Sequence, residues 1–281
     1  MRILVTGARG MIGSKLVDAL LAKGYSVIGV DLAEPGQERE GYVYCRIDLS
    51  QGEELKRFIA QHQPDRIIHL AALAHTGGEN DLSWERYYHV NVECARNVFE
   101  AAGDKPVLFI STVDVYGFGD GTPVTPHTLP QPVSSYGKSK RLAEEECMRL
   151  PHFTIFRFSP VYTDTVKRDI QKRYYLKYPS VAYRIGKGSA YEVLNVRKAA
   201  EAMVRWCAET PRNEIQILKD DAPLWTPDAI AAEKRAGRAK LVLPFPRWAV
   251  KCGYAVLLRL LGQGEKTYLL NKAVYPLKSE S

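Results

Sequence analysis

Tyr136 and Lys140 have the residue types and the spacing of a proton-transfer pair. They stand four positions apart in a segment, 136–150, whose pattern predicts a helix, so both side chains leave the same face. A phenol has a pKa of about 10, which is too high for an efficient base at neutral pH. A neighbouring ammonium favours the phenolate and lowers that pKa toward the range where proton transfer is efficient. The pair predicts acid–base chemistry, although the same spacing also occurs on ordinary surface helices.

A glycine-rich loop near the start of the sequence predicts a dinucleotide site. The segment TGARGMIG places Gly7, Gly10 and Gly13 between a predicted strand and a predicted helix. Glycine permits the tight turn and the close approach of a pyrophosphate, and the N–H groups at the helix start attract phosphate. Asp31 ends the next strand, where a carboxylate accepts hydrogen bonds from ribose hydroxyls and repels a 2′-phosphate. The expected cofactor is therefore NAD rather than NADP.

The elements that must position these residues alternate between strand and helix. The sequence predicts strands at 2–6, 26–30, 66–70, 107–111 and 153–158 and helices at 12–23, 53–62, 84–102, 136–150 and 196–208. This alternation favours an α/β fold, a Rossmann doubly wound parallel sheet with a small C-terminal substrate lobe. Thr112 follows one of these strands, at the carboxyl end where such sheets bind ligands, so its hydroxyl could polarise a substrate oxygen.

The regular alternation weakens after residue 163. The segment 164–190 is polar and rich in Tyr, Lys and Arg, and prolines interrupt the segment 210–281. We therefore expect an NAD-binding domain formed by 1–163 and 191–208, and a substrate lobe formed by 164–190 and 209–281.

Composition narrows the class of protein. Hydrophobic residues make up 46% of the 281 residues and charged residues 25%, as in ordinary globular proteins. The absence of a secretion signal and of a long apolar run predicts a cytoplasmic protein. The cysteines lie far apart without ligand spacing, so neither a metal site nor disulfides are expected at Cys45, Cys94, Cys147, Cys207 and Cys252. The net charge of +7 is dispersed, which favours a solvated surface or a phosphate-bearing substrate over nucleic acid.

Four ordered motifs carry a resemblance to a known family. They are the loop TGARGMIG, the segment HLAA at 69–72, the segment STVDVYG at 111–117 and the segment YGKSK at 136–140. Together they resemble the extended short-chain dehydrogenase/reductase superfamily, and within it the NAD-dependent epimerase/dehydratase family that acts on nucleotide sugars. The resemblance is close over about the first 165 residues and loose over 166–208.

The resemblance implies roles for individual residues. Tyr136 would be the acid/base, Lys140 its activator and ribose anchor, and Thr112 the third catalytic hydroxyl. Besides Tyr136 and Lys140, the residues expected at the cofactor are Gly7, Gly10, Met11, Ile12, Gly13, Asp31, Asp48, Leu49, Leu70, Ala71, Ala72 and Ser111. Asp48 and Leu49 would lie near the adenine.

Other residues are candidates for the substrate side of the site. Asn91 matches an asparagine beside the site in relatives, and the alternative is a side chain that stabilises its helix. His75 lies just past the HLAA segment, where a surface loop is the alternative. Thr112 is also expected at the substrate, through its hydroxyl. A nucleotide diphosphate needs cations, which Lys167, Arg168 or Arg184 could supply; each of these three also suits a solvated surface.

The residues after Thr112 bear on the reaction. Family dehydratases carry Asp-Glu at these positions, whereas this sequence has Val113 and Asp114. Valine cannot protonate a leaving hydroxyl, so the resemblance implies a nucleotide-sugar 4-epimerase or 4-ketoreductase. Pro160 stands where relatives have an asparagine that touches substrate, which leaves the identity of the sugar open.

Other interpretations of the sequence remain. The same catalytic residues suit an NAD-dependent dehydrogenase of an apolar alcohol, with a pocket lined by Tyr174, Tyr175, Leu176 and Tyr183, or a non-catalytic NAD sensor. Family members form dimers through two long helices, here 84–102 and 136–150, so a homodimer is expected. The apolar segment 247–261 contains three cations and favours a helix packed on the lobe or at a dimer interface, with a membrane surface as the alternative.

Overall fold

The chain forms two compact units. The structure, a computed structural model, describes residues 1–74, 83–165 and 168–280. Unit 1 comprises residues 1–113, 135–158 and 196–216, and unit 2 comprises residues 114–134, 159–195 and 217–281. Residues 114–134, 159–163 and 191–195, which the expected boundaries assign to the NAD-binding domain, are thus grouped with unit 2, and residues 209–216, expected in the lobe, are grouped with unit 1.

Unit 1 is built on a seven-stranded sheet with the strand order β12-β6-β5-β4-β1-β2-β3. Neighbouring strands from β6 to β3 pair in parallel. The strands are β1 (Arg2–Thr6), β2 (Ser26–Asp31), β3 (Tyr42–Arg46), β4 (Arg66–His69), β5 (Val107–Thr112), β6 (Phe153–Phe158) and β12 (Glu214–Leu218). The parallel order brings the carboxyl ends of β1, β4 and β5 to one edge of the sheet, where ligands of such folds bind.

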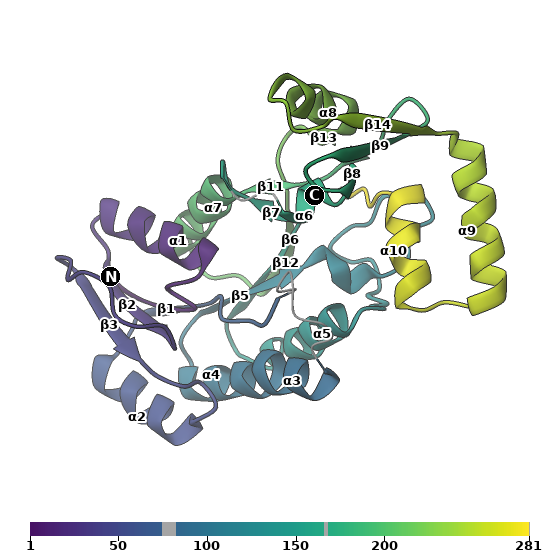
Figure 1. Cartoon of the computed structure of the whole chain (residues 1–281). Helices are drawn as coiled ribbons and strands as arrows, with labels where there is room; N and C mark the ends of the chain where they lie inside the picture. The colour runs from purple at the N-terminus through teal and green to yellow at the C-terminus, as the bar shows by residue number, and fades with distance from the viewer. Residues whose placement is uncertain (75–82, 166–167, 281) are drawn as a thin grey trace. The chain divides into compact units, whose positions relative to one another are not determined.

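Helices cover both faces of this sheet. α1 and α7 lie together on one face, and α2, α4 and α5 lie on the other (Figure 1). The helices are α1 (Met11–Ala22), α2 (Gly52–His62), α3 (Trp84–Tyr88), α4 (Cys94–Ala102), α5 (Ser135–Cys147) and α7 (Val196–Ala208). The doubly wound Rossmann fold expected from the alternation is confirmed. A π-helical turn, His89–Glu93, separates α3 from α4, so the single helix predicted for 84–102 is divided.

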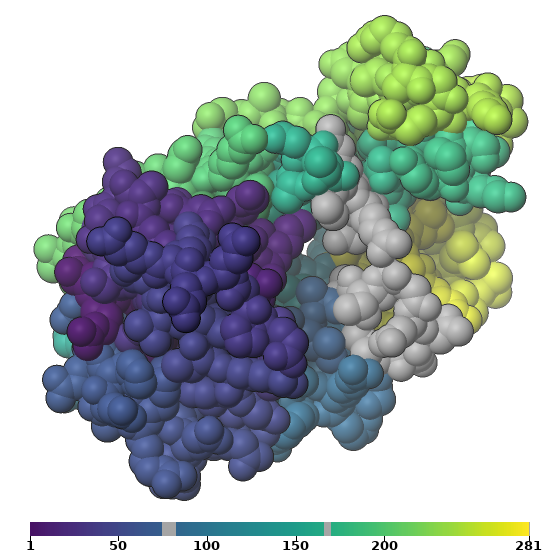
Figure 2. Space-filling model, turned by 60° about the vertical axis from the view of Figure 1, so that its left-hand side comes forward, coloured from purple at the N-terminus to yellow at the C-terminus, as the bar shows by residue number. Residues whose placement is uncertain are grey.

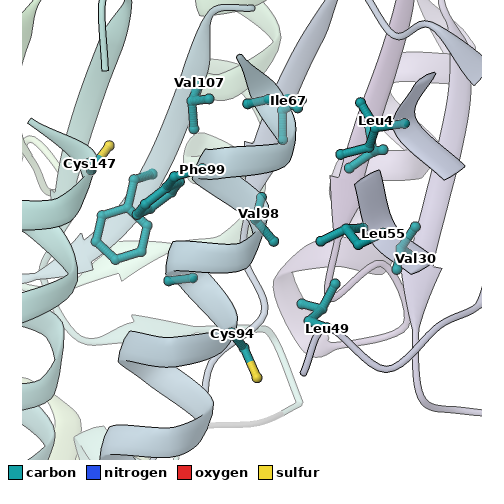
Figure 3. Close-up of a cluster of buried hydrophobic side chains, with 14 of the residues drawn as sticks. Leu4, Val30, Leu49, Leu55, Ile67, Cys94, Val98, Phe99, Val107 and Cys147 are labelled. Carbon is teal, nitrogen blue, oxygen red and sulfur yellow. The ribbon is translucent and has the colours of Figure 1, made fainter. Parts of the chain in front are cut away.

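The core of unit 1 lies between the sheet and the α2–α4–α5 layer. Leu4, Ile67 and Val107 come from three neighbouring strands, and Leu55 and Phe99 come from the helices that cover them (Figure 3). The three central strands are buried on both faces, which explains why their sequences are continuous apolar runs. In Figure 2 the purple and blue segments that come forward are the N-terminal part of unit 1, where β3 forms an edge of the sheet.

Unit 2 contains a smaller sheet and its own core. Its three-stranded sheet has the order β14-β9-β8, in which β14 pairs with β9 in parallel and β8 pairs antiparallel. The strands of the unit are β7 (Val161–Tyr162), β8 (Tyr175–Lys177), β9 (Val181–Ile185), β10 (Ala190–Tyr191), β11 (Leu194–Asn195), β13 (Leu224–Trp225) and β14 (Leu241–Phe245). Its core includes Tyr174, Tyr175, Ala182, Val193 and Ile230.

The helices of unit 2 stand mostly near the end of the chain. They are a 3₁₀ turn (Val113–Tyr116, whose first residue belongs to unit 1), α6 (Arg168–Gln171), α8 (Thr226–Arg235), α9 (Arg247–Leu261) and α10 (Glu265–Val274). α9 and α10 lie side by side (Figure 1). Among the residues that the structure describes, none of these helices is long and apolar enough to cross a membrane.

Candidate active site

The glycine loop after β1 is shaped by backbone-to-backbone contacts. Gly7 has a φ of +68°, and a Cβ atom there would lie 2.8 Å from the backbone nitrogen of Ala71. A Cβ atom on Gly13 would lie 2.0 Å from the carbonyl oxygen of Gly7. Gly10 forms the N-cap of α1 and has no side chain to cover the first N–H groups of that helix. Met11 in this first turn is exposed, and Ile12 is half-buried. The loop is a cradle that only glycine permits, beside an uncapped helix start.

Asp31 lies against this loop. Its Oδ2 atom accepts a hydrogen bond of 2.9 Å from the backbone N–H of Arg9, and its Oδ1 atom accepts from the N–H groups of Leu32 and Ala33. These three backbone donors fix the carboxylate at the carboxyl end of β2. The sequence prediction that Asp31 and the glycine loop form one constellation is thus matched by their direct contact.

Asp48 and Leu49 have different surroundings. Asp48 is exposed, and its carboxylate accepts a hydrogen bond of 2.9 Å from the backbone N–H of Ser50. The Leu49 side chain is buried in the core of unit 1, and its carbonyl oxygen accepts a hydrogen bond from Asn97. The Leu49 side chain is therefore a core group, and any role it has at an adenine would fall to its backbone.

The segment Leu70–Ala72 follows β4 and lies beside the glycine loop. The backbone N–H of Ala71 donates to Oγ1 of Thr6 over 3.2 Å, and the same hydroxyl lies 2.7 Å from Nδ1 of His69. Burial, together with the charge of Lys140, lowers the pKa of His69 to about 3, so this imidazole is neutral. The sequence pattern alone predicts no role for Thr6 or His69. The HLAA motif could have indicated a buried hydrogen bond at His69, because a histidine at the end of a buried strand requires a polar partner.

Lys140 and Tyr136 leave α5, which packs against β5. Lys140 is buried, and its Nζ atom lies 4.0 Å from the ring centre of Phe109 in β5. Burial lowers the pKa of Lys140 to about 7, although the charge of Glu144 opposes this shift. Tyr136 is half-buried one turn earlier on α5, and its ring centre lies 6.3 Å from that of Tyr87. The phenol and the amine expected to work together therefore occupy the inner side of one helix.

The end of β5 supplies two hydroxyls. Ser111 is buried, and its Oγ atom has no hydrogen-bond partner among the described residues. Thr112, the last residue of the strand, is half-buried. A buried hydroxyl without a protein partner is rare, and it points to a polar group that is supplied from outside the chain. This observation favours the predicted place of Ser111 at a bound ligand.

Asn91 connects the π-helical turn to two parts of the site. Its side-chain amide donates to the carbonyl of Leu73 over 3.0 Å and to Oγ of Ser139 over 2.9 Å, and it accepts from the N–H of Leu73. Ser139 in turn donates to the backbone carbonyl of Tyr136. These bonds give Asn91 a positioning role, since they tie the segment after Ala72 to the helix that carries Tyr136. Direct contact of Asn91 with substrate stays a prediction.

A buried ion pair, which sequence analysis missed, holds α5 against the sheet. Arg157 in β6 donates from Nε and Nη2 to the two carboxylate oxygens of Glu144 over 2.9 and 2.8 Å. Both side chains are almost fully removed from solvent. Because Glu144 stands one turn beyond Lys140, the pair fixes the helix in register and places a negative charge near the amine.

Three of the predicted substrate residues have no described side chain. His75 and Lys167 lie outside the described residues, and only the backbone of Arg168 is described. Arg184 is exposed on β9 in unit 2. Among the residues the structure describes, it shows no group of side chains that could hold a metal ion.

Asp114 has a structural environment within unit 2. Its carboxylate accepts hydrogen bonds from Tyr268 (2.8 Å), from Ser134 and from Lys272. Burial alone would raise its pKa, but the charge of Lys272 and these three donors hold the pKa below its usual value. The carboxylate is ionised and committed to α10. At the two positions where dehydratases carry acids, this chain therefore has a valine and an anchored carboxylate.

Sequence comparison identifies relatives with nucleotide-sugar activities. A probable UDP-arabinose 4-epimerase 1 from Oryza sativa subsp. japonica is 32% identical over 162 residues, which is 51% of this chain and 37% of that protein. A UDP-glucose 4-epimerase from Rhizobium meliloti is 31% identical over 148 residues, which is 51% of this chain and 45% of that protein. The chain thus spans less than half the length of these curated relatives.

Solved structures share the fold, and a family profile covers most of the chain. The Thermus thermophilus UDP-glucose 4-epimerase in complex with NAD superposes with a TM-score of 0.67 at 25% identity, covering 88% of this chain and 86% of that one. The Bacillus cereus UDP-glucuronic acid 4-epimerase in complex with NAD has a TM-score of 0.69 at 22% identity, with 98% of each chain covered, which shows the shared fold. The family profile matches residues 3–213. With this match across the cradle, the β5 hydroxyls and the Tyr136–Lys140 helix, the chain belongs to the NAD dependent epimerase/dehydratase family.

Proposed function

We propose that the protein is an NAD-dependent nucleotide-sugar 4-epimerase. The observation that carries the proposal is the placement of Lys140, a buried amine over Phe109, one helical turn from Tyr136 and beside the strand that ends in Ser111 and Thr112. A surface helix would not bury its lysine at a desolvation cost unless the amine served the site. The 4-epimerase activities named for its relatives support the choice of reaction.

The residues present fit NAD. The cradle of Gly7, Gly10 and Gly13 accepts a pyrophosphate beside the uncapped start of α1. Asp31, fixed at this loop, would accept hydrogen bonds from the adenosine ribose and exclude a 2′-phosphate. The unpaired hydroxyl of Ser111 would gain a partner at the nicotinamide end. When bound, NAD supplies the acceptor and donor of a hydride.

The chain's own residues would handle the proton. Oη of Tyr136 would take the proton of the sugar's C4 hydroxyl as that carbon is oxidised, and would return it when the carbon is reduced on the opposite face. The Lys140 ammonium would stabilise the phenolate, and Thr112 would hold the same substrate oxygen. Asp114 would take no part in elimination, because its carboxylate is held by Ser134, Tyr268 and Lys272.

The substrate class is part of the proposal. The relatives named above act on UDP-sugars, and a diphosphate would be bound by cations such as Lys167, Arg168 or Arg184 of unit 2. The alternative of an apolar alcohol is less well supported, because Tyr174 and Tyr175, two of the four residues expected to line its pocket, belong to the core of unit 2. The hydroxyl of Tyr175 is also used, since it donates to Glu233 over 3.0 Å.

A homodimer through the helices of unit 1 is proposed from the family resemblance. α3 presents Trp84, which is 38% exposed and lies with its ring centre 5.8 Å from that of Tyr88. α4 and α5 lie side by side on the same face of the sheet. Light scattering during size-exclusion chromatography tests this, because a monomer at all concentrations would contradict it.

Incubation with UDP-sugars tests the function directly. The enzyme with NAD is mixed with UDP-glucose, UDP-arabinose, UDP-glucuronic acid or UDP-N-acetylglucosamine, and proton NMR follows inversion at C4. We expect one of these sugars to reach an equilibrium of two C4 epimers without net change in NADH absorbance. Stoichiometric production or consumption of NADH would identify a 4-ketoreductase instead.

Tyr136→Phe separates chemistry from binding. The variant keeps the aromatic ring that lies by Tyr87 but cannot carry the proton, so we expect turnover to fall at least about 100-fold while NAD binding is retained. Isothermal titration measures the binding, and Tyr88→Phe, a half-buried tyrosine outside the proposed site, is the control. Wild-type turnover in Tyr136→Phe would rule out the mechanism.

A further inference from the structure

The helix α9 exposes most of its apolar residues. It is 15 residues long and buries only Tyr254 among them. Trp248, Val256 and Leu260 are exposed by 71, 56 and 74%, and Leu261 at its end by 61%. The sequence favours packing of such a helix on the lobe or at a dimer interface, and within this chain only the side that contains Tyr254 is packed. An apolar helix left in this state requires another partner.

The exposed residues form one continuous face. Tyr254 marks the inner side of α9, where its hydroxyl accepts a hydrogen bond from Asn271 of α10 and its ring packs on Tyr275. The four residues of the outer strip recur every fourth position, about half a turn from Tyr254, and are Trp248, Cys252, Val256 and Leu260. This outer strip runs roughly 18 Å along the helix, at 1.5 Å per residue.

Charge identifies the kind of partner. Unit 2 contains 18 lysines and arginines against 11 aspartates and glutamates, and so carries a formal charge of +7, which is the charge of the whole chain. Unit 1 has 21 of each and is neutral. The segment of α9 contains no acidic residue and three cations: Arg247, which donates to the carbonyl of Gly188, Lys251, which lies over the ring of Tyr275, and Arg259. An apolar strip on a unit with this charge complements an anionic surface.

We propose that the outer strip of α9 docks unit 2 on an anionic lipid bilayer. Tryptophan and leucine on one face with neighbouring cations are the features of helices that lie in the membrane interface, with the apolar face at the acyl boundary and the cations at lipid phosphates. Arg259 lies next to the strip on the helix surface and would reach those phosphates. A second copy of the chain is a poorer occupant, because it would bring another +7 unit against the first.

Vesicle co-sedimentation of the full chain tests the proposal. We expect binding to vesicles of phosphatidylcholine mixed with phosphatidylglycerol, little binding to phosphatidylcholine alone, and release at about 0.5 M salt, where surface charges are screened. Arg259→Gln should weaken binding about fivefold, the effect of one basic residue near an anionic surface. No binding to the anionic vesicles at low salt would overturn the proposal.

The apolar contribution has a matched control. Leu260 and Leu129 both belong to unit 2 and are exposed by 74 and 71%, but only Leu260 lies on the strip. Leu260→Gln should weaken vesicle binding at least about tenfold, because a buried leucine contributes roughly 1.5–3 kcal/mol, and Leu129→Gln should leave it unchanged. Both sites are exposed, so thermal unfolding should match the wild type. Equal binding by the two variants, or self-association that Leu260→Gln abolishes, would show that the strip has a different occupant.

Discussion

Lys140 is held in surroundings that oppose its charge. Its amine is buried over the ring of Phe109, and burial lowers its pKa to about 7, with Glu144 as a partial compensation. Near pH 7 the amine is therefore only partly protonated before any ligand binds. Such a group can respond to the phenol at Tyr136 by gaining a proton when the phenolate forms.

The stability of the protein should rise with pH because of Lys140. Its pKa in the folded state, about 7, lies below the ordinary 10.5, so between these values the unfolded chain binds more protons than the folded one. Lys140→Met removes the cost of burying the charge, which is on the order of 5 kcal/mol below pH 7 and vanishes above about pH 10.5. Urea unfolding near pH 7 and near pH 10 should show the gain at the lower pH alone. Lys138 is an exposed residue of the same helix, so Lys138→Met should change the free energy of unfolding equally at the two pH values.

Gly13 should tolerate no side chain. The Cβ atom of Gly13→Ala would lie 2.0 Å from the Gly7 carbonyl, so the cradle must open. We expect NAD affinity, measured by titration calorimetry, to fall more than about tenfold, or about 1.4 kcal/mol. Gly253→Ala, in α9, meets no atom within 4 Å and should leave affinity unchanged while raising stability by about 0.5–1 kcal/mol. Normal affinity in Gly13→Ala would contradict the close packing of the loop.

At the scale of the element, α5 depends on a buried charge pair for its position. Arg157 and Glu144 make two hydrogen bonds in a region almost without solvent. Such a pair contributes little net stability relative to apolar residues, but it is costly to break. The helix that carries Tyr136 and Lys140 is thus fixed by residues that do not themselves touch a ligand.

Single and double replacements should separate the cost of breaking the ion pair from its net contribution to stability. Arg157→Met removes both buried hydrogen bonds to Glu144 and leaves its carboxylate with the single bond of 3.2 Å from Arg141, so we expect the free energy of unfolding in urea to fall by about 3–5 kcal/mol. The double variant Arg157→Met/Glu144→Leu should recover most of that loss, because two apolar side chains of similar size replace the pair. Additive losses in the double variant would show that packing, and not charge pairing, dominates at this place.

The 3₁₀ turn after Thr112 depends on α10 in a similar way. Asp114 has a pKa below the usual 3.8 because of Lys272 and two hydroxyl donors, so its contribution to stability is present above about pH 4 and is lost as the pH falls through its folded value. Asp114→Asn should lower the free energy of unfolding near pH 7 by about 1–3 kcal/mol, and the difference from wild type should shrink below pH 4. Leu129→Asn, at an exposed position of the same unit, is the control. A difference independent of pH would mean that the carboxylate is not the stabilising form.

Local patterns predicted much of unit 1 and of its site. The helix 196–208 was predicted at its observed bounds, and the glycine loop, Asp31 and the Tyr136–Lys140 pair depend on spacing within one or two neighbouring elements. The Arg157–Glu144 and Lys272–Asp114 contacts were not predicted, because each joins residues of two different elements and no local pattern encodes it. In the second contact the two residues are 158 positions apart. Only the folded chain brings such partners together.

Prolines explain why unit 2 was difficult to predict. Pro227 lies in the first turn of α8, where a missing N–H costs nothing, and Pro244 lies in β14, an edge strand of its sheet. Pro246 precedes α9 as its N-cap. These prolines therefore lie at the starts and edges of elements, whereas proline in a sequence predicts interruption of helices and strands.

At the scale of the whole molecule, the expected cofactor residues and the net charge are divided between the units. Those residues, from Gly7 to Lys140, belong to unit 1, which is neutral, while the entire formal charge of +7 belongs to unit 2. A ligand that binds one unit should therefore stabilise that unit against unfolding more than the other unit.

Calorimetry with NAD should reveal this division. NAD at about 100 times its Kd should stabilise the protein by about 2.7 kcal/mol. If the units unfold in separate transitions, only the transition of unit 1 should move to higher temperature. Fluorescence of Trp84 and Trp206, both in unit 1, would identify that transition. NADP at the same concentration is the control, because Asp31 would repel its 2′-phosphate. Equal stabilisation by both nucleotides would contradict the role given to Asp31.

The cysteines differ sharply in their access to reagents. Cys94, Cys147 and Cys207 are buried, and burial raises the pKa of each thiol, as it does for the half-buried Cys45. Cys252 alone among the five is exposed, in the middle of the outer strip. Because maleimides react with accessible thiolates, an environment-sensitive dye would attach to the unaltered protein at this one position. The natural sequence thus carries its own labelling site, from which the polarity around α9 can be followed in real time.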